Sequence, residues 1–415
     1  MISSSSLPLQ NSPTFKSVTW TKANPPKKPS IVTNHVASCG LHSTDIMRAL
    51  KKSAKMARAG HDLNMGLWLD GRAAQWDYLS WLPVESDNSF EEYVNRVILG
   101  SKSTSFCFSL FNLQCFEDVI WKWGQTFSRL YTERVGLPSG EVDIDVFLGR
   151  YSVTPRGIHR DPADTLMFVL EGSKRLMFWP EEYFQGHIFS KGKSGSETLV
   201  GIRIEDYIDD AISIEAKAGD VIYWPSDYWH VGYQKESHSE VSMAMNIGFH
   251  RKTECNTVGA INDLLMTISN RIHRNENEFN MDDQSFIAPT EKAILDLLAN
   301  GVVDTPAADM LRWSKMKFLS SCGFLAVPNL KNIEWDMEDS GNWQLVFKGA
   351  LITYRTNARE VEVAANGHLE TFYTDEILSG ILEKLKNGET VYLSFQEKYT
   401  RIWKFLKGAG AIIPA

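Results

Sequence analysis

The sequence is poor in cysteine, and its few cysteines are not spaced for a metal site or a disulfide framework. The 415 residues include five cysteines, an odd number, and no two of them form a CxxC pair. This pattern argues against a cysteine zinc site and favours a reducing, cytoplasmic compartment. Cys107 lies in the apolar stretch Phe106–Phe111, where it is expected to be a small core residue.

The chain also lacks long hydrophobic runs and a signal-like start. No apolar run approaches the ~20 residues that cross a bilayer, which excludes an integral membrane protein. Met1–Gln10 has neither a basic flank nor an apolar core, so a secretory signal is not expected, although the shortage of acidic residues before residue 30 leaves an organelle transit peptide open. Hydrophobic residues make up 43% and charged residues 23%, as in ordinary globular proteins.

Acidic residues are nearly absent from the first 60 positions. That segment holds nine Lys or Arg and one acidic residue, Asp45, so the rest of the chain carries a net charge of −16 within a total of −8. The basic residues of Arg48–Arg58 are expected to form a solvated face, with a contact for an acidic peptide or nucleic acid as the alternative. The acidic remainder argues against direct nucleic-acid binding.

Composition and periodicity divide the chain into four expected segments. These are a flexible arm at 1–30, a large domain at 31–255, a helical linker or dimerisation segment at 256–304 and a small C-terminal domain at 305–415. The lead-in of the second segment is expected to contain helices at Thr44–Ala59 (capped by Thr44), Phe90–Leu99 and Phe116–Val135, and strands at Gly66–Leu69 and Phe106–Leu113.

From Val142 the hydrophobic period changes to two, which is typical of strands. Val142, Ile144, Val146 and Leu148 alternate with Asp143, Asp145 and Phe147, as in a half-buried strand. Further short strands are expected at Leu166–Leu170, Arg175–Trp179, Val221–Trp224 and Val241–Phe249. Short strands broken by Gly and Pro indicate a β-sandwich or barrel.

The C-terminal segments have a different pattern. An apolar stripe at Ile261, Leu264, Leu265, Ile268 and Ile272 predicts helices that pack on the barrel or form a homodimer contact. Asn366-Gly367 predicts a hairpin between Val361–Ala364 and His368–Phe372. Thr374 is expected to cap a helix that ends at Asn387-Gly388, before a strand at Val391–Phe395 and a helix at Tyr399–Lys407. This combination resembles a winged helix.

The chemistry is expected at Gly157-Ile-His-Arg-Asp-Pro162. His159 and Asp161 are two residues apart, so on a strand their side chains share a face. His230, which ends the run Gly219–His230, is the candidate third ligand. Two imidazoles and one carboxylate form the facial triad of non-haem Fe(II) oxygenases, which leaves positions open for a bidentate cosubstrate and O₂.

Two other His-x-Glu pairs in the sequence show that this spacing alone is weak evidence for a metal site. His238-Ser-Glu240 lies in a polar stretch and is expected to be a loop, and His368-Leu-Glu370 follows the Asn-Gly turn and is expected to be a solvated hairpin. Lys174 favours the pair His159 and Asp161 as the metal site. It follows the strand Leu166–Leu170 and a turn, so the returning strand is expected to place it at the depth of that pair. There it would bind the distal carboxylate of a dicarboxylate; the alternative is a lysine at the barrel rim.

These segments resemble the JmjC-type branch of cupin oxygenases, which depend on Fe(II) and 2-oxoglutarate. The matching pieces are His159-x-Asp161, Gly172-x-Lys174-Arg175, Trp179-Pro180, Gly219-Asp-Val-Ile-Tyr-Trp-Pro225 and Tyr228-Trp-His230, with 152–155 before the first ligand. The spacing from His159 to Lys174 resembles the asparaginyl-hydroxylase subgroup, and the helical segment and winged-helix-like end resemble ribosomal oxygenases.

The resemblance implies an α+β fold with a double-stranded β-helix (jelly-roll) core. It implies that His159, Asp161 and His230 bind Fe(II) and that Lys174 binds 2-oxoglutarate, which is converted with O₂ to succinate and CO₂ while a C–H bond is hydroxylated. Thr165 stands where family members often have Asn, and Arg156 where a small hydroxyl residue is common. Further candidates for cosubstrate contacts are Thr165, Ser242, Tyr151, Asn246 and Arg156. For the uncharged residues the alternative is hydrogen bonding within the core. Arg156 could instead bind a carboxylate of the substrate.

The leading functional hypothesis is a hydroxylase of an amino-acid residue in a peptide or protein, either a ribosomal protein or the precursor peptide of a natural product. The C-terminal segments favour it, because they could recruit a macromolecule. An oxygenase of a free amino acid or other small molecule is the second hypothesis, and a non-catalytic cupin that serves as an interaction module is the third. Demethylation of methyl-lysine is a fourth.

Overall fold

The computed structural model describes residues 27–33, 40–74, 77–136, 138, 140–192, 195–233, 240–251, 306–357 and 359–415. The expected arm up to residue 26, the expected helices within 256–304 and His238 lie outside these residues. The chain divides into two compact units, one containing Met1–Arg251 and Ser321–Lys331, the other Lys252–Ser320 and Asn332–Ala415. The domain boundaries expected from the sequence remain a prediction. No helix among the described residues is long and apolar enough to span a membrane.

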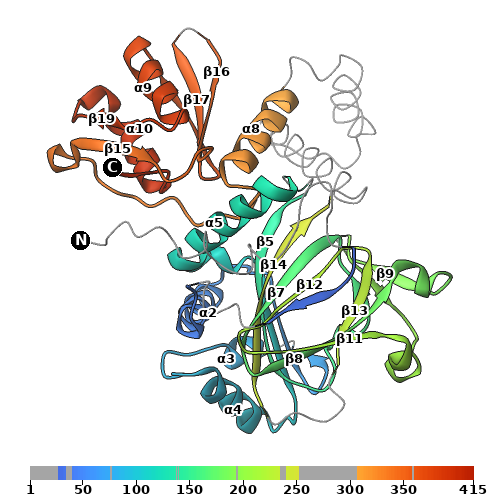
Figure 1. Ribbon diagram of the computed structural model, residues 1–415. Coiled ribbons are helices and arrows are strands. Elements are labelled where there is room, and N and C mark those ends of the chain that lie inside the picture. Colours follow the sequence, from blue (N-terminus) through green and yellow to red (C-terminus); the bar gives the residue numbers. More distant parts are fainter. Residues whose placement is uncertain are drawn as a thin grey trace, which may run out of the picture. The chain divides into compact units, whose positions relative to one another are not determined.

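The first unit is a mixed α+β structure with antiparallel sheets (Figure 1). Its helices are α2 (Ser43–Arg58), α3 (Tyr78–Trp81), α4 (Phe90–Ser101) and α5 (Asp118–Val135), with 3-10 turns at Leu113–Cys115, Glu181–Phe184, Ile204–Asp206 and Ile208–Asp210. Its strands are β1 (Ser30–Val32), β2 (Met65–Leu69), β3 (Arg72–Ala73), β4 (Phe106–Leu110), β5 (Val142–Arg150), β6 (His159–Arg160), β7 (Ala163–Glu171), β8 (Ser173–Pro180), β9 (Phe189–Lys191), β10 (Glu197–Leu199), β11 (Ile212–Lys217), β12 (Val221–Trp224), β13 (Tyr228–Gly232) and β14 (Ser242–His250).

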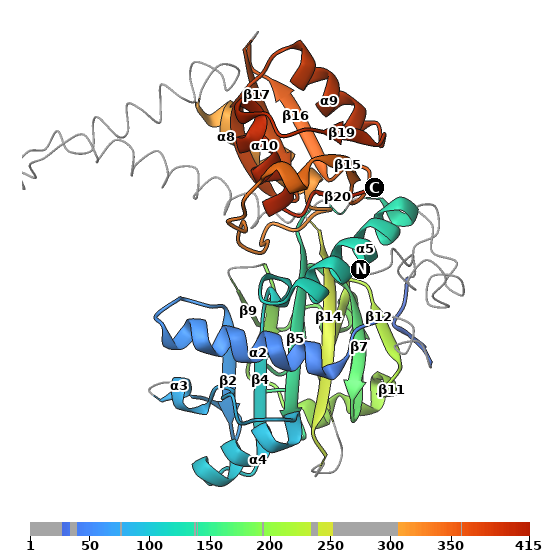
Figure 2. The same ribbon diagram turned by 90° about the vertical axis from the view of Figure 1, so that its left-hand side faces the viewer.

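Two sheets pack face to face in this unit. Among the described residues, one sheet has the order β1-β12-β7-β14-β5-β4-β2-β3 and the other β11-β8-β13-β6-β10-β9. Buried side chains from both sheets share one apolar core, including Met167 of β7, Phe178 of β8 and Trp224 of β12. The outer face of the larger sheet is covered by α2 and α5, which lie across β5, β14 and β7 in Figure 2.

Strand β5 is more buried than the half-buried strand that was expected, since none of its residues is exposed and only Asp143, Phe147 and Arg150 are partly so. Ile144 and Val146 pack toward the helices, as the period of two predicts. Asp145 pairs with Asn246 of β14 on the opposite face, and only 9% of Asp145 is exposed. The polar residues of the alternation thus lie on a largely buried face, where a solvent-facing side was expected.

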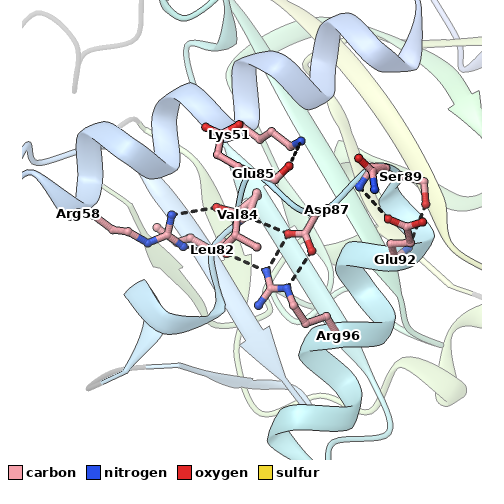
Figure 3. A network of polar contacts seen from close by, with 11 residues as sticks. Lys51, Arg58, Leu82, Val84, Glu85, Asp87, Ser89, Glu92 and Arg96 are labelled. Atoms are coloured by element: carbon pink, nitrogen blue, oxygen red, sulfur yellow. Dashed lines mark hydrogen bonds and ion pairs between the residues drawn. The ribbon is translucent and has the colours of Figure 1, made fainter.

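The basic residues of α2 and α4 bind the loop that precedes α4, as Figure 3 shows. The guanidinium of Arg58 donates to the backbone carbonyls of Leu82 and Pro83, at 2.9 Å each. Arg96 binds both carboxylate oxygens of Asp87 at 2.9 Å. Arg58 belongs to the basic segment that was expected to be a solvated face, and it therefore has a structural role, because it satisfies partly buried backbone carbonyl groups.

The second unit has its own core. Its elements are α8 (Pro306–Ser320), a 3-10 turn (Met337–Asp339), β15 (Gly341–Leu345), β16 (Leu351–Arg355), β17 (Glu360–Ala365), β18 (His368–Tyr373), α9 (Glu376–Lys386), β19 (Val391–Leu393), α10 (Glu397–Gly408) and β20 (Ile412–Pro414). Its described strands form two antiparallel sheets, β19-β15-β20 and β16-β17-β18. The expected hairpin is confirmed, since Asn366 and Gly367 have φ of 45° and 86° between β17 and β18.

Two expected helix caps are wrong by one residue or two. Helix α2 begins at Ser43 with His42 as N-cap, whereas Thr44 was expected to cap it. Helix α9 begins at Glu376 with Asp375 as N-cap, and the Asp375 carboxylate accepts the backbone N–H of Leu378. Asp and Thr are both good N-caps, so the sequence alone does not decide between neighbouring candidates.

Candidate metal centre

Strands β6 and β13 bring His159, Asp161 and His230 together. His159 pairs directly with His230 across these strands, and their ring centroids are 4.2 Å apart. Asp161 follows β6, and its Oδ2 lies 3.6 Å from Nε2 of His159 and 3.8 Å from Nε2 of His230. The three ligand atoms all lie within 4.8 Å of one another, the one such group in the part of the chain that the structure describes.

Hydrogen bonds orient both imidazoles for metal binding. Nδ1 of His159 lies 2.9 Å from the carbonyl oxygen of Gly157, and Nδ1 of His230 lies 3.4 Å from that of Tyr228. Each Nδ1–H can therefore donate to a carbonyl, which leaves the lone pair of Nε2 directed at Asp161. Burial lowers the pKa of His159 and brings that of His230 to about 3, so both rings are neutral at physiological pH.

Asp161 is ionised in this setting. Burial alone would raise its pKa, but His159 and the guanidinium of Arg156 lower it below the ordinary value. Two neutral imidazole nitrogens and one carboxylate oxygen are the donor set of non-haem Fe(II) sites, and all three come from one end of the space between the sheets. The residues present therefore fit a divalent metal ion.

Lys174 is buried in the space between the two sheets, but not at the level of His159 and Asp161, where the sequence analysis placed it. His230 pairs with Phe178 of β8, and Lys174 is four residues further along that strand on the same face, which corresponds to ~13 Å. The expectation that Lys174 returns to the level of His159 and Asp161 is wrong, because β7 and β8 are long enough to carry it to the opposite end.

No carboxylate among the described residues forms an ion pair with Lys174. Only 4% of Lys174 is exposed, and its Nζ donates to the hydroxyl of Tyr151 at 2.9 Å. Burial lowers the pKa of Lys174 to about 8. The ring of Tyr151 lies over Gly149, where an added Cβ would be 2.2 Å from it, so a glycine is required there.

The other candidate residues are spread along the same interior. The hydroxyl of Ser242 lies 3.3 Å from the carbonyl oxygen of Gly149, near Lys174, and that of Thr165 lies 3.4 Å from the carbonyl oxygen of Ala163. Asn246 faces Asp145 across the β5–β14 pair, and its Oδ1 is buried without a hydrogen-bond partner. Their cosubstrate contacts remain predictions. Arg156 contacts Asp161 itself, with Nη1 3.3 Å from Oδ1.

A second group of ionisable residues near the triad was not singled out from the sequence. Nε2 of His250 lies 3.0 Å from Oδ2 of Asp143, and burial together with Asp143 raises the pKa of Asp145 well above its ordinary value. Burial alone would lower the pKa of His250, but Asp143 raises it to about 9. The available signal was the position of Asp143 and Asp145 on the face of β5 opposite its apolar stripe.

Comparisons with known proteins bear on the fold. No family model matches the sequence, and no curated protein does. The chain is similar to the X-ray structure of Escherichia coli YcfD, with 14% identity over 97% of each chain and a TM-score of 0.50. Two further structures of E. coli YcfD, described as a ribosomal oxygenase, contain cobalt with 2-oxoglutarate or with succinic acid; they have 14% and 13% identity, the same coverage and TM-scores of 0.47 and 0.45. The chain therefore shares the fold of Escherichia coli YcfD.

Proposed function

We propose that this protein is a dioxygenase dependent on Fe(II) and 2-oxoglutarate that hydroxylates a C–H bond of an amino-acid residue in a peptide or protein. The observation that carries the proposal is the convergence of Nε2 of His159, Nε2 of His230 and Oδ2 of Asp161. These atoms would hold the iron on one side and leave positions open on the other. The bound iron would supply the O₂ chemistry, and the protein would supply orientation and exclusion of water.

The cosubstrate would lie between the triad and Lys174. Its keto-acid end would bind the metal, and its distal carboxylate would bind the ammonium of Lys174 and the hydroxyl of Tyr151. A buried ammonium whose hydroxyl neighbour carries no charge is costly without an anion, which supports this assignment. Apolar side chains such as Phe178 and Met167 would keep water from the reacting atoms.

The two sheets that pack around the site would be the double-stranded β-helix of the JmjC-type oxygenases. The second unit would be a winged-helix-like domain that recruits the substrate. YcfD is described as a ribosomal oxygenase, and a ribosomal protein or a precursor peptide is the substrate class proposed here. A second copy of the chain is a further proposed partner.

The first test uses the metal ligands. Exchange of His159 for Ala should abolish 2-oxoglutarate turnover and lower the affinity for Mn(II) or Co(II) by orders of magnitude, because it removes one of three ligands. His368→Ala is the matched control, since His368 begins a second His-x-Glu pair on β18 in the other unit. Turnover that survives in the His159 variant, or equal losses in both variants, would contradict the proposed centre.

The second test identifies the substrate. Purified protein with Fe(II), 2-oxoglutarate and ascorbate is incubated with ribosomal proteins and peptide pools, and intact masses are measured. A gain of one oxygen in a peptide, absent with the His159 variant, is the expected result. Oxidation of free amino acids without any modified peptide would replace the peptide hypothesis by the small-molecule one. Absence of any 2-oxoglutarate turnover would favour the hypothesis that the protein is a non-catalytic cupin.

A further inference from the structure

The two oxygens of the Asp161 carboxylate face different partners. Oδ2 is the atom near the two imidazoles, at 3.6 Å and 3.8 Å from their Nε2 atoms. Oδ1 lies 3.3 Å from Nη1 of Arg156. One oxygen of the carboxylate therefore faces the candidate metal centre, and the other faces a guanidinium. Arg156, which carries this guanidinium, precedes His159 by only a few residues.

Arg156 is itself held from the other side. Its Nη2 donates to the hydroxyl of Ser196, a residue that is only 2% exposed. Ser196 directly precedes β10, and Thr198 of that strand pairs with His159. The hairpin of β9 and β10 is thus bonded to the same strand that carries the metal ligands, and it fixes the arginine against Asp161.

Further contacts keep this hairpin in register with β6. Arg160 of β6 forms ion pairs with Glu197 at 2.6 Å and with Glu181 at 2.5 Å. Packing around Ser196 is close, because a Cβ added at Gly192 would be 2.7 Å from its hydroxyl oxygen. The position of the Ser196 hydroxyl, and with it that of the Arg156 guanidinium, is therefore set by the fold.

We propose that Arg156 is a positioning residue that makes Asp161 a one-oxygen ligand; this inference rests on the proposed metal centre. A carboxylate without a partner on its second oxygen can chelate a metal with both oxygens, and it would then occupy one of the three open positions. A guanidinium bonded to Oδ1 opposes that rotation and keeps Oδ2 directed at the imidazoles. Three positions then remain for a bidentate cosubstrate and O₂.

This assignment replaces the sequence-based expectation that Arg156 binds a carboxylate of the cosubstrate or substrate. Lys174, at the far end of the interior, is the group available for the distal carboxylate. Arg156 already has Asp161 and Ser196 as partners, although 39% of its side chain is exposed. If Arg156 positions Asp161, its loss should change metal binding even without cosubstrate. If Arg156 binds the cosubstrate, its loss should leave metal binding unchanged.

The experiment measures binding of Co(II) and Mn(II) to the full chain in the absence of 2-oxoglutarate. Arg156→Ala should weaken metal binding about 10- to 100-fold, as losses of hydrogen bonds to metal ligands typically do. It should also change the visible absorption of the Co(II) protein, because a two-oxygen aspartate raises the coordination number. Arg156→Lys and Ser196→Ala should give smaller changes of the same kind.

Arg175→Ala is the matched control. Arg175 lies on β8 and its Nε also donates to a serine hydroxyl, that of Ser213 at 3.0 Å. The control should bind metal like the unmodified protein. Thermal unfolding without metal checks that each variant is folded, and if Arg156→Ala does not fold, Arg156→Lys and Ser196→Ala decide the question.

The outcomes separate this inference from the proposed function. If the unmodified protein binds neither metal at this site, the metal centre itself is wrong. If the unmodified protein binds and the folded Arg156 and Ser196 variants bind equally well with unchanged Co(II) spectra, the positioning role is wrong. Unchanged metal binding with weakened 2-oxoglutarate binding would assign Arg156 to the cosubstrate and would also overturn the inference.

Discussion

Lys174 illustrates how a single residue connects burial to function. Its ammonium is removed from water and has the Tyr151 hydroxyl at 2.9 Å and the Tyr151 ring at 4.9 Å. Neither partner carries a compensating charge, and burial is the main reason for its lowered pKa. An anionic ligand would restore favourable electrostatics, so this residue is expected to contribute to cosubstrate affinity more than to the chemical step.

Exchange of Lys174 for Ala should therefore raise KM for 2-oxoglutarate about 10- to 100-fold, the range expected when a hydrogen bond to a charged group is lost. kcat at saturating 2-oxoglutarate should change little, because the metal ligands are untouched. Lys386→Ala is the control, since Lys386 pairs with Glu383 on the surface of α9. Steady-state kinetics of 2-oxoglutarate turnover measures both constants. An unchanged KM in the Lys174 variant would make that lysine structural.

The lowered pKa of Lys174 also predicts a pH dependence. An ordinary lysine stays protonated to about pH 10.4, whereas Lys174 in the free protein loses its proton near its pKa of about 8. Binding of a carboxylate requires the protonated form, so 2-oxoglutarate affinity should be constant below pH 8 and fall above it, up to tenfold per pH unit. Titrations of the Mn(II)-loaded protein between pH 6.5 and 9.5 measure this. Affinity that is flat to pH 9.5 would contradict the assignment.

The residues of the candidate site differ in how far sequence could predict them. His159 and Asp161 were found because two ligands on one strand face need a spacing of two, and they do converge with His230. The depth of Lys174 was missed, because it depends on the register in which β8 pairs with β13, and the sequence does not show that register. Arg156 and Ser196 meet through a hairpin, β9–β10, whose pairing with β6 leaves no signal in the spacing of either residue.

At the level of elements, the loop before α4 depends on a buried ion pair. Asp87 is 3% exposed and accepts two bonds from Arg96, which also donates to the carbonyl oxygen of Leu82 at 3.0 Å (Figure 3). Removal of one partner would leave an uncompensated charge in the interior, whereas the pair itself adds less to stability than its geometry suggests.

Arg96→Ala should lower the free energy of unfolding by about 3 kcal/mol, because the carboxylate of Asp87 then stays buried without its partner. Arg129→Ala is the matched control: Arg129 pairs at 3.7 Å on α5 with Glu133, whose side chain is 58% exposed, so no buried carboxylate is left behind and the loss should cost less than about 0.5 kcal/mol. Urea unfolding followed by tryptophan fluorescence compares the two. Equal losses in both variants would show that the Asp87 pair is not the source of the effect.

The elements themselves were largely predictable where local rules suffice. The Asn366-Gly367 turn and the apolar stripe of β5 follow from backbone sterics and a period of two. Burial of Asp145 could not be predicted, because it depends on residues far along the chain, such as Asn246 of the neighbouring strand β14. The N-cap at Asp375 was missed because its neighbour Thr374 is a similarly good cap, and the one at His42 because histidine is not among the residues that usually cap helices.

The whole molecule contains two separate cores, and the chain passes between the units more than once. Phe324 of the segment Ser321–Lys331 is buried in the first unit, where its ring contacts Trp121 at 5.3 Å between centroids. The second unit has its own core around Trp403 and Leu406. Units with separate cores are expected to unfold as separate cooperative steps.

Calorimetry of the full chain should therefore show two unfolding transitions, and metal should act on one of them. The proposed metal ligands His159, Asp161 and His230 all belong to the first unit, and a metal ion that binds only the folded state stabilises the unit that contains its site. Mn(II) at 100 times its dissociation constant should add about 2.7 kcal/mol to that transition and leave the other in place. The His159→Ala variant should lose the shift. A single transition, or a shift of both transitions with metal, would mean that the two cores are energetically coupled and that the division of the chain into units does not describe its stability.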